Sequence, residues 1–172
     1  MDFSKLIAER YSVRKFENKH LTQSEIDEIL AAGHIAPTGC NIQPQRILVL
    51  NTDQSIKKLK PCTKCHFDAS CAFLVCFDKT ECWQRKYDGA LSGYADASIV
   101  ATHMMLKICD MGLGSTWVMH FDPAKMRETY NIPENIEPVA RLVAGYPSRD
   151  AAPLQIHFDQ RPLDEVTVYD SF

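Results

Sequence analysis

The chain has 172 residues, of which 45% are hydrophobic and 24% charged, and its formal net charge is −3, so it fits a single domain with a packed core. Its acidic and basic residues are interleaved, no apolar run reaches the roughly 20 residues of a membrane-spanning helix, and the N-terminus lacks the apolar stretch of a signal peptide. Length, composition and charge therefore argue against a nucleic-acid or membrane partner, and we expect one domain over residues 1–172 in the cytoplasm.

Apolar residues recur at helical spacing in two N-terminal segments. The first helix is expected from Asp2, as N-cap, to about Arg10, followed by an extended segment over residues 11–16. The second begins at the capping-box pattern Thr22 to Glu25 and continues to about residue 33. The pattern then predicts a loop over 36–44, a strand over 46–50, one or two helical turns over 55–60 and a buried strand over 72–77.

The longest helix is expected from about Ala90 to Met111. It is apolar around most of its circumference, which is typical of a helix in the middle of a protein, and Gly112 ends it. The pattern then predicts a helix over 122–130, a strand over 139–144 and a last strand over 166–169. This mixed order favours an α+β fold in which helices flank a sheet. If the chain after Pro147 is ordered, we expect it to lie on a partner subunit.

A cluster of donor groups follows the first helix. Arg10, Ser12 and Arg14 alternate along an extended segment and so share one face, with Tyr11 between them. Two guanidinium groups and a hydroxyl are suited to binding a phosphate. A solvated protein surface would give the same spacing, so the segment alone leaves both interpretations open.

Two further clusters could border a flat heterocycle. Asn41 and Gln43, in the loop over residues 37–44, offer donors and acceptors, although ordinary turn chemistry also uses such residues. The glycines of residues 112–117 would let the backbone approach a ring closely, although a helix C-cap also explains Gly112.

Taken together and in this order, these clusters resemble the nitroreductase family. The resemblance rests on Arg10-Tyr11-Ser12-Val13-Arg14, Ala36-Pro37-Thr38-Gly39-Cys40-Asn41-Ile42-Gln43-Pro44, Asp96, Gly112-Leu113-Gly114-Ser115-Thr116-Trp117 and Val143-Ala144-Gly145-Tyr146-Pro147. It implies an α+β nitroreductase-like fold with a central mixed or antiparallel sheet. It also implies an interlocked homodimer with two FMN sites at the interface between the subunits.

The resemblance assigns a role to each cluster. Arg10 and Ser12 would hold the ribityl phosphate, and Arg14 would face the pyrimidine end of the flavin. The loop over residues 37–43 would reach the same flavin from the other subunit. The residues expected to bind FMN are Arg10, Tyr11, Ser12, Arg14, Pro37, Thr38, Gly39, Asn41, Gln43, Leu113, Gly114, Ser115 and Arg161.

The last of these, Arg161, stands where the chain departs from the family pattern. Family members carry a Lys/Arg pair shortly after the Gly-Tyr-Pro turn to complete the phosphate site. Here the corresponding stretch keeps Arg161 and His157, and Arg149 lies earlier. The departure predicts either weaker FMN binding or another side chain in place of the pair.

The resemblance implies an enzyme that uses NAD(P)H to reduce FMN and then passes the electrons, in a ping-pong cycle, to a nitroaromatic, a quinone or a similar acceptor. No protein acid or base is expected to be catalytic. The variable region between Cys62 and Ala90 would form a lid that selects the acceptor. Two alternatives remain: a flavin sensor or reservoir without efficient turnover, and a related flavin reaction such as reductive dehalogenation or flavin breakdown.

Seven cysteines, an odd number without a signal peptide, are expected to be free thiols in a reducing compartment. The run Cys62-Thr63-Lys64-Cys65-His66 resembles half of a zinc site, but the other cysteines do not repeat its spacing, so no metal is expected. A thiol–disulfide role for the pair is also disfavoured, because a thioredoxin-like context is absent.

Overall fold

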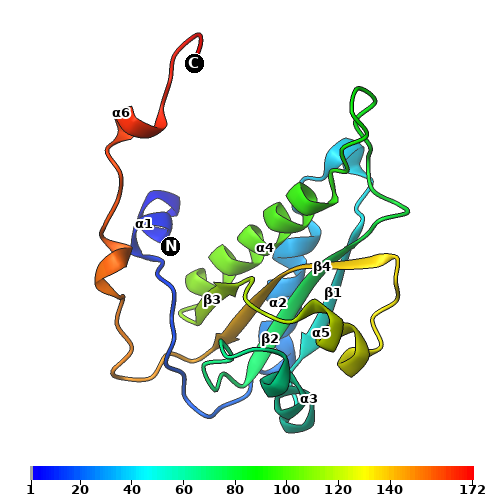
Figure 1. The fold of residues 1–172 in the computed structure, drawn as a ribbon. Helices are drawn as coiled ribbons and strands as arrows, with labels where there is room; N and C mark the ends of the chain where they lie inside the picture. The colour runs from blue at the N-terminus through cyan, green and yellow to red at the C-terminus, as the bar shows by residue number, and fades with distance from the viewer. Residues whose placement is uncertain (1) are drawn as a thin grey trace.

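A four-stranded antiparallel sheet lies at the centre of the structure, a computed structural model that describes residues 2–172 (Figure 1). The strand order is β1-β2-β4-β3. The strands are β1 (Gln45–Leu50), β2 (Cys71–Asp78), β3 (Gly114–Val118) and β4 (Ile136–Gly145). The antiparallel sheet with flanking helices confirms the expected α+β class.

The two inner strands explain the continuous apolar runs of the sequence. All eight residues of β2 are buried, because helices cover both faces of the sheet and strands lie on both sides of β2. The pairing of β2 with β4 is interrupted once, since Val75 pairs with Ala140 but Cys76 pairs with Pro138. A bulge at this point accommodates a proline, which has no N–H to donate to the neighbouring strand.

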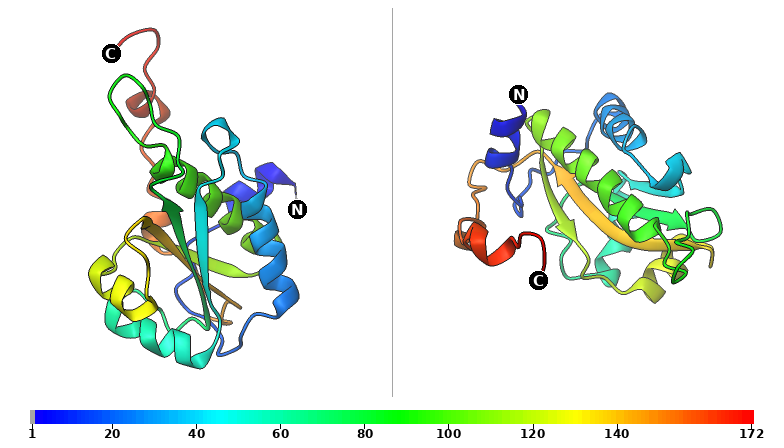
Figure 2. Two further views of the ribbon diagram at one scale, coloured as in Figure 1. Left: turned by 90° about the vertical axis from the view of Figure 1, so that its right-hand side faces the viewer. Right: turned by 90° about the horizontal axis from the view of Figure 1, so that it is seen from above.

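Helices form a layer on each face of the sheet (Figures 1 and 2). One core lies under α2 (Gln23–His34) and α4 (Gly93–Asp110), and a second core lies on the opposite face. The second core packs under α3 (Asp53–Leu59), the short helix η2 (Lys60–Cys62) and α5 (Pro123–Tyr130).

The start of α4 lies in direct contact with the sheet. A Cβ atom on Gly93 would stand 2.0 Å from Cδ2 of Phe77 on β2, so only glycine fits at this position. The neighbouring Tyr94 ring packs edge-on against the same Phe77 ring, with their centroids 5.0 Å apart. This contact fixes where α4 begins on the sheet.

The two terminal segments leave the body on the same side (Figures 1 and 2). Helix α1 (Phe3–Glu9) packs beside the C-terminal half of α4, and the chain then runs along β3. The C-terminal tail carries the turn η3 (Gln155–His157) and the one-turn helix α6 (Leu163–Val166). Its apolar side chains are exposed, namely Leu154, Ile156, Phe158, Leu163, Val166, Val168, Tyr169 and Phe172.

Most of the expected elements are confirmed within a few residues, including the Asp2, Thr22 and Asp122 caps. Strand β3 was not expected, because it has only five residues and begins with Gly114 and Ser115, so that its pairing with β4 defines it. The strand expected over 166–169 is wrong: Val166 ends α6, and residues 167–169 have no neighbouring strand to satisfy their backbone groups. The loop over 36–44 contains one short 3₁₀ turn, η1 (Gly39–Asn41).

We predict that Gly93→Ala lowers the free energy of unfolding by about 1–3 kcal/mol, the usual cost of overpacking a core. The gain in helix propensity from alanine is smaller, at most about 1 kcal/mol. Urea unfolding followed by circular dichroism measures the difference. As a control, Ala95→Ser at an exposed position of the same helix should change stability by no more than about 0.5 kcal/mol. Equal stability of Gly93→Ala and the parent would contradict the contact with Phe77.

Candidate functional site

The N-terminal extended segment lies directly against β3. The N–H of Val13 donates to the carbonyl of Ser115 at 3.0 Å, and Ser12 forms a parallel bridge with Ser115. The hydroxyl of Thr116 donates to the carbonyl of Val13. A Cβ atom on Gly114 would stand 2.7 Å from Val13, so the close approach requires glycine. The fold therefore brings together two of the three clusters that the sequence singled out.

The donors of this segment are available for an anion. Arg10 and Arg14 are half-buried, and the guanidinium group of Arg10 makes no hydrogen bond or ion pair with residues 2–172. Arg14 uses Nη1 to donate to the carbonyl of Ser12 at 3.0 Å, which leaves its other N–H groups unused. The hydroxyl of Ser12 likewise has no partner within the described chain. Two cations and a hydroxyl thus lie within five residues with most of their donors free.

The Gly145-Tyr146-Pro147 turn lies beside the chain that follows the Arg10–Arg14 segment. The N–H of Glu17 donates to the carbonyl of Tyr146 at 2.8 Å, and Phe16 pairs with Pro147. The Tyr146 hydroxyl lies 2.8 Å from Oε1 of Glu25. These contacts hold the N-terminal segment along the end of the sheet.

The loop over residues 37–43 is anchored at the other end of α4. The N–H of Gly39 donates to Oδ1 of Asp96 at 2.8 Å, and Oδ2 of the same carboxylate accepts from the Ser92 hydroxyl at 2.6 Å. Asp96 is only 2% exposed, so these bonds satisfy a buried charge. Within the loop, the N–H of Gln43 donates to Oγ1 of Thr38 at 3.0 Å.

The same loop has an unusual backbone. Cys40, Asn41 and Gln43 have positive φ angles of 49°, 55° and 57°, a region that few residues other than glycine adopt. Three such residues within four positions indicate a conformation that the surrounding contacts impose. The exposed side chains of Asn41 and Gln43 thus belong to a loop with a defined shape.

Helix α4 separates these two parts of the site. The loop over 37–43 is tied to its first turn through Asp96, whereas Leu113, Gly114 and Ser115 follow its C-terminus. A helix of 18 residues is about 27 Å long. One chain therefore does not bring all three clusters around a single ligand.

The tail contributes little to the site. The Tyr11 hydroxyl donates to the carbonyl of Ala151 at 3.3 Å, and the Tyr11 ring lies edge-on to His157. Arg161, expected to help hold a phosphate, is exposed and makes no hydrogen bond or ion pair with residues 2–172. Its placement in the site thus stays a prediction.

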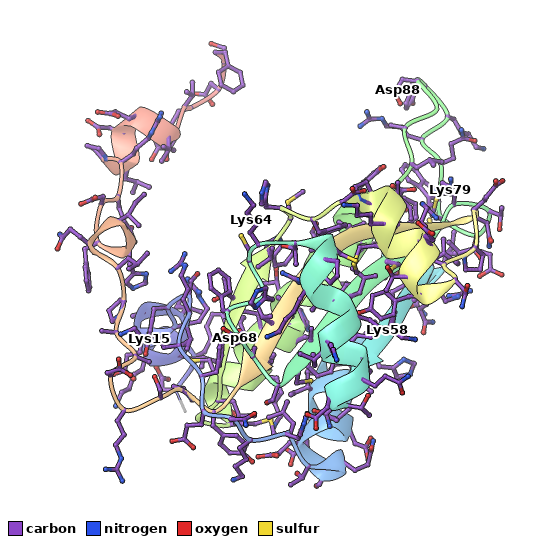
Figure 3. The ribbon with its side chains drawn as sticks, turned by 60° about the horizontal axis from the view of Figure 1, so that its bottom comes forward. Lys15, Lys58, Lys64, Asp68, Lys79 and Asp88 are labelled. Carbon is purple, nitrogen blue, oxygen red and sulfur yellow. The ribbon has the colours of Figure 1, made fainter. Side chains whose placement is uncertain are left out.

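The region expected to form a lid, residues 62–90, contains the buried strand β2. Only the part after β2 is a hairpin that projects from the body, with Lys79 at its base and Asp88 at its tip (Figure 3). The carbonyl of Trp83 accepts a hydrogen bond from the N–H of Ser92 at 2.8 Å. The Cβ atom of Trp83 lies 3.1 Å from where a Cβ atom on Gly39 would stand. The hairpin therefore packs on the loop over 37–43. Ser92, for which no sequence pattern indicated a role, joins the hairpin to the Asp96 anchor.

In the described part of the chain, no three or more His, Cys, Asp or Glu side chains lie together as a possible metal site. No helix among residues 2–172 has both the length and the apolar character needed to cross a bilayer.

Comparisons with known proteins identify relatives of this chain. The model of the Nitroreductase family matches residues 7–72 and 66–146. A nitroreductase family protein from Clostridium difficile 630 has a crystal structure with a TM-score of 0.93 and 37% identity, covering 100% of both chains. An NADPH-dependent oxidoreductase from Staphylococcus aureus is 25% identical over 174 residues, covering 90% of this chain and 69% of that protein. An FMN-dependent nitroreductase from Clostridium difficile R20291 shares the fold, with a TM-score of 0.78, 20% identity and coverage of 97% and 98%.

We predict that Asp96→Ala releases the loop over 37–43, because the N–H of Gly39 and the hydroxyl of Ser92 lose a charged acceptor. Hydrogen exchange at the Gly39 amide should become faster, and the free energy of unfolding should fall by about 1–3 kcal/mol. Asp96→Asn is the matched control, since its amide oxygen still accepts from Gly39 and should preserve most of the protection. Unchanged exchange at Gly39 in Asp96→Ala would show that the carboxylate does not anchor the loop.

Proposed function

Because this chain belongs to the nitroreductase family, we propose that it is an FMN-dependent oxidoreductase that passes electrons from NAD(P)H to a small acceptor such as a nitroaromatic or a quinone. Its similarity to an NADPH-dependent oxidoreductase and to an FMN-dependent nitroreductase supports the nicotinamide and the flavin. The observation that carries the proposal is the pairing of the Arg10–Arg14 segment with β3, since it places free anion-binding donors beside a glycine-containing strand.

The donors present fit the phosphate end of FMN. Arg10 and Ser12 would bind the phosphate, because a guanidinium group can bond two phosphate oxygens and a hydroxyl adds a third donor. The backbone of Leu113, Gly114 and Ser115 would border the ring, and the adjacent Tyr11 would lie beside the phosphate donors. Arg161 is a further candidate for the phosphate if the tail is repositioned on binding.

When bound, FMN supplies the two-electron chemistry of a ping-pong cycle in which the nicotinamide leaves before the acceptor binds. The protein's part is to position and to stabilise charge. Arg14, half-buried and restrained by its bond to the Ser12 carbonyl, is the fixed cation suited to the negative charge that develops at the pyrimidine end of the ring. The Asn41 and Gln43 side chains, in the loop with Pro37, Thr38 and Gly39, provide donors and acceptors for the ring edge.

We further propose that two copies complete each site as a homodimer. The length of α4 keeps the loop over 37–43 away from Arg10 in one chain, so a second copy has to supply it. A tail that extends from the body with eight exposed apolar side chains supports the same assembly, because burying them requires another surface. The groove between α1 and α4, lined by Phe3, Leu6 and Leu106, offers such a surface. Free cysteines support a place in the reducing cytoplasm.

We predict that the protein, purified with excess FMN removed, shows a flavin absorption spectrum and that NADH or NADPH bleaches it under anaerobic conditions. Adding a quinone or a nitroaromatic should restore the colour, and initial rates at several acceptor concentrations should give parallel double-reciprocal lines. A colourless protein that does not take up added FMN would refute the proposal. Full flavin occupancy with very slow nicotinamide oxidation would instead favour a flavin sensor or reservoir, and products from a halogenated substrate would favour reductive dehalogenation.

We predict that Arg10→Ala and Asn41→Ala each weaken FMN binding about 10- to 100-fold, the loss of one or two charge-assisted or neutral hydrogen bonds. Refolding an equal mixture of the two variants should restore one tight site in each heterodimer, because one interface then combines the intact arginine with the intact loop. Fluorescence titration with FMN measures both classes of site. Lys125→Ala, an exposed charge on α5, is the control and should bind like the parent. If the mixture binds FMN no more tightly than each variant alone, each chain builds its own site.

A further inference from the structure

The face of the sheet opposite α4 contains a buried arginine. Arg141 on β4 is fully buried, and its Nη2 donates to the carbonyl of Cys65 at 2.8 Å. Its Nε and Nη1 atoms are buried without a hydrogen-bond partner among residues 2–172. Burying a charged donor without a partner costs free energy, so an acceptor or an anion beside this guanidinium group would stabilise it.

No carboxylate supplies that anion in the described chain, since none forms an ion pair with Arg141. Burial lowers the pKa of Arg141 to about 10, and the ionisable groups that oppose this effect are Cys65, Tyr130 and Cys62. The guanidinium group thus stays protonated at neutral pH. Its electrostatic neighbours are two thiols and a phenol, and the pKa of Tyr130 is itself raised to about 12 by burial, so the phenol stays neutral.

The two thiols belong to one tightly held turn, whose Lys64 is labelled in Figure 3. The N–H of Cys65 donates to Oγ1 of Thr63 at 3.0 Å, and that hydroxyl donates to the carbonyl of His120 at 2.6 Å. The sulfur of Cys62 is buried, 3.5 Å from Oγ1 of Thr129, whereas Cys65 is half-buried. The pair therefore combines one accessible thiol with one protected thiol three residues away.

Two other buried cysteines, one in each core, show what burial does to a thiol. Burial raises the pKa of Cys71 to about 12, and it does the same for Cys76, so both remain protonated and unreactive. Cys62 and Cys65 differ from them because they lie beside Arg141, whose Nη2 donates to the Cys65 carbonyl and whose other donors are unused.

We propose that Cys62 and Cys65 form a peroxide-sensitive dithiol whose reactive thiolate is stabilised by the buried guanidinium group of Arg141. This site lies across the sheet from the proposed FMN site and does not depend on it. The sequence alone disfavoured a thiol–disulfide role because nothing near the pair resembled thioredoxin. The cation comes from Arg141, 76 residues after Cys65.

The chemistry needs hydrogen peroxide or an organic hydroperoxide as the oxidant. The thiolate of Cys65 attacks a peroxide oxygen, so that an S–O bond forms, the O–O bond breaks, and the leaving oxygen takes up a proton as water or an alcohol. Cys62 then attacks the sulfur of the resulting sulfenic acid, forming the S–S bond and releasing hydroxide, which takes the thiol proton as water. The two thiols lose two electrons in total, and the peroxide accepts both of them.

The test uses the full-length FMN-loaded protein, reduced, desalted and treated with a small excess of hydrogen peroxide before alkylation and trypsin digestion. Trypsin cuts after Lys64, so a Cys62–Cys65 disulfide joins two peptides, and fragmentation assigns the bond within them. We expect this linked pair to form at a lower peroxide dose than oxidation of the other cysteines, and treatment with dithiothreitol should remove it. Free Cys62 and Cys65 at a peroxide dose that already oxidises the exposed Cys40 would overturn the proposal.

Matched variants separate the parts of the site. Cys62→Ser should accumulate a dimedone-reactive sulfenic acid at Cys65, whereas Cys65→Ser should give none at Cys62. Arg141→Met should slow the oxidation of Cys65 roughly tenfold, because a neighbouring cation no longer favours the thiolate, and Arg141→Lys should restore most of the rate.

The variant Cys109→Ser removes a half-buried thiol from α4 and should leave the linkage unchanged. If Arg141→Met does not fold, Arg141→Gln takes its place, because glutamine keeps polar donors but has no charge and should slow the oxidation of Cys65 in the same way. A rate that is independent of residue 141 would refute the role of the arginine.

Discussion

The packing of α4 on the sheet is the constraint on which the rest of the structure depends. The helix begins where Gly93 meets the Phe77 ring without an intervening side chain, and it ends where Gly112 turns the chain into β3. Each end then organises a part of the candidate site: Asp96 holds the loop over 37–43, and β3 holds the N-terminal segment. The length of the helix thus decides which candidate site residues can meet within one chain.

This separation gives the proposed homodimer a chemical purpose. A flavin needs donors at its phosphate and at its ring edge, and the chain places those donors at opposite ends of a helix about 27 Å long. The protruding tail and the groove beside α1 are surfaces that a second copy would bury. Binding of the cofactor and association of the subunits would then be coupled, since each site would draw on both copies.

The two faces of the sheet serve different chemistry. The face under α2 and α4 is apolar and supports the candidate flavin site at its ends. The opposite face contains Arg141, whose charge is isolated among thiols and a phenol. Burying a guanidinium group without a carboxylate partner is costly, and the proposed role of the neighbouring Cys62 and Cys65 gives this arrangement a function.

Periodicity and capping in the sequence determined most helices and the inner strands, because those signals are local: Thr22 and Glu25 form the capping box of α2, and the apolar run of β2 reflects burial on both faces. The clusters around Arg10 and Asn41 could be predicted as well, because each consists of residues that are close together in the sequence. Only the tertiary structure decided that β3 is a strand, that residues 167–169 are not, and that Arg141 lies beside Cys65. Strand pairing and burial of a charge depend on residues far apart in the chain, and no local pattern records them.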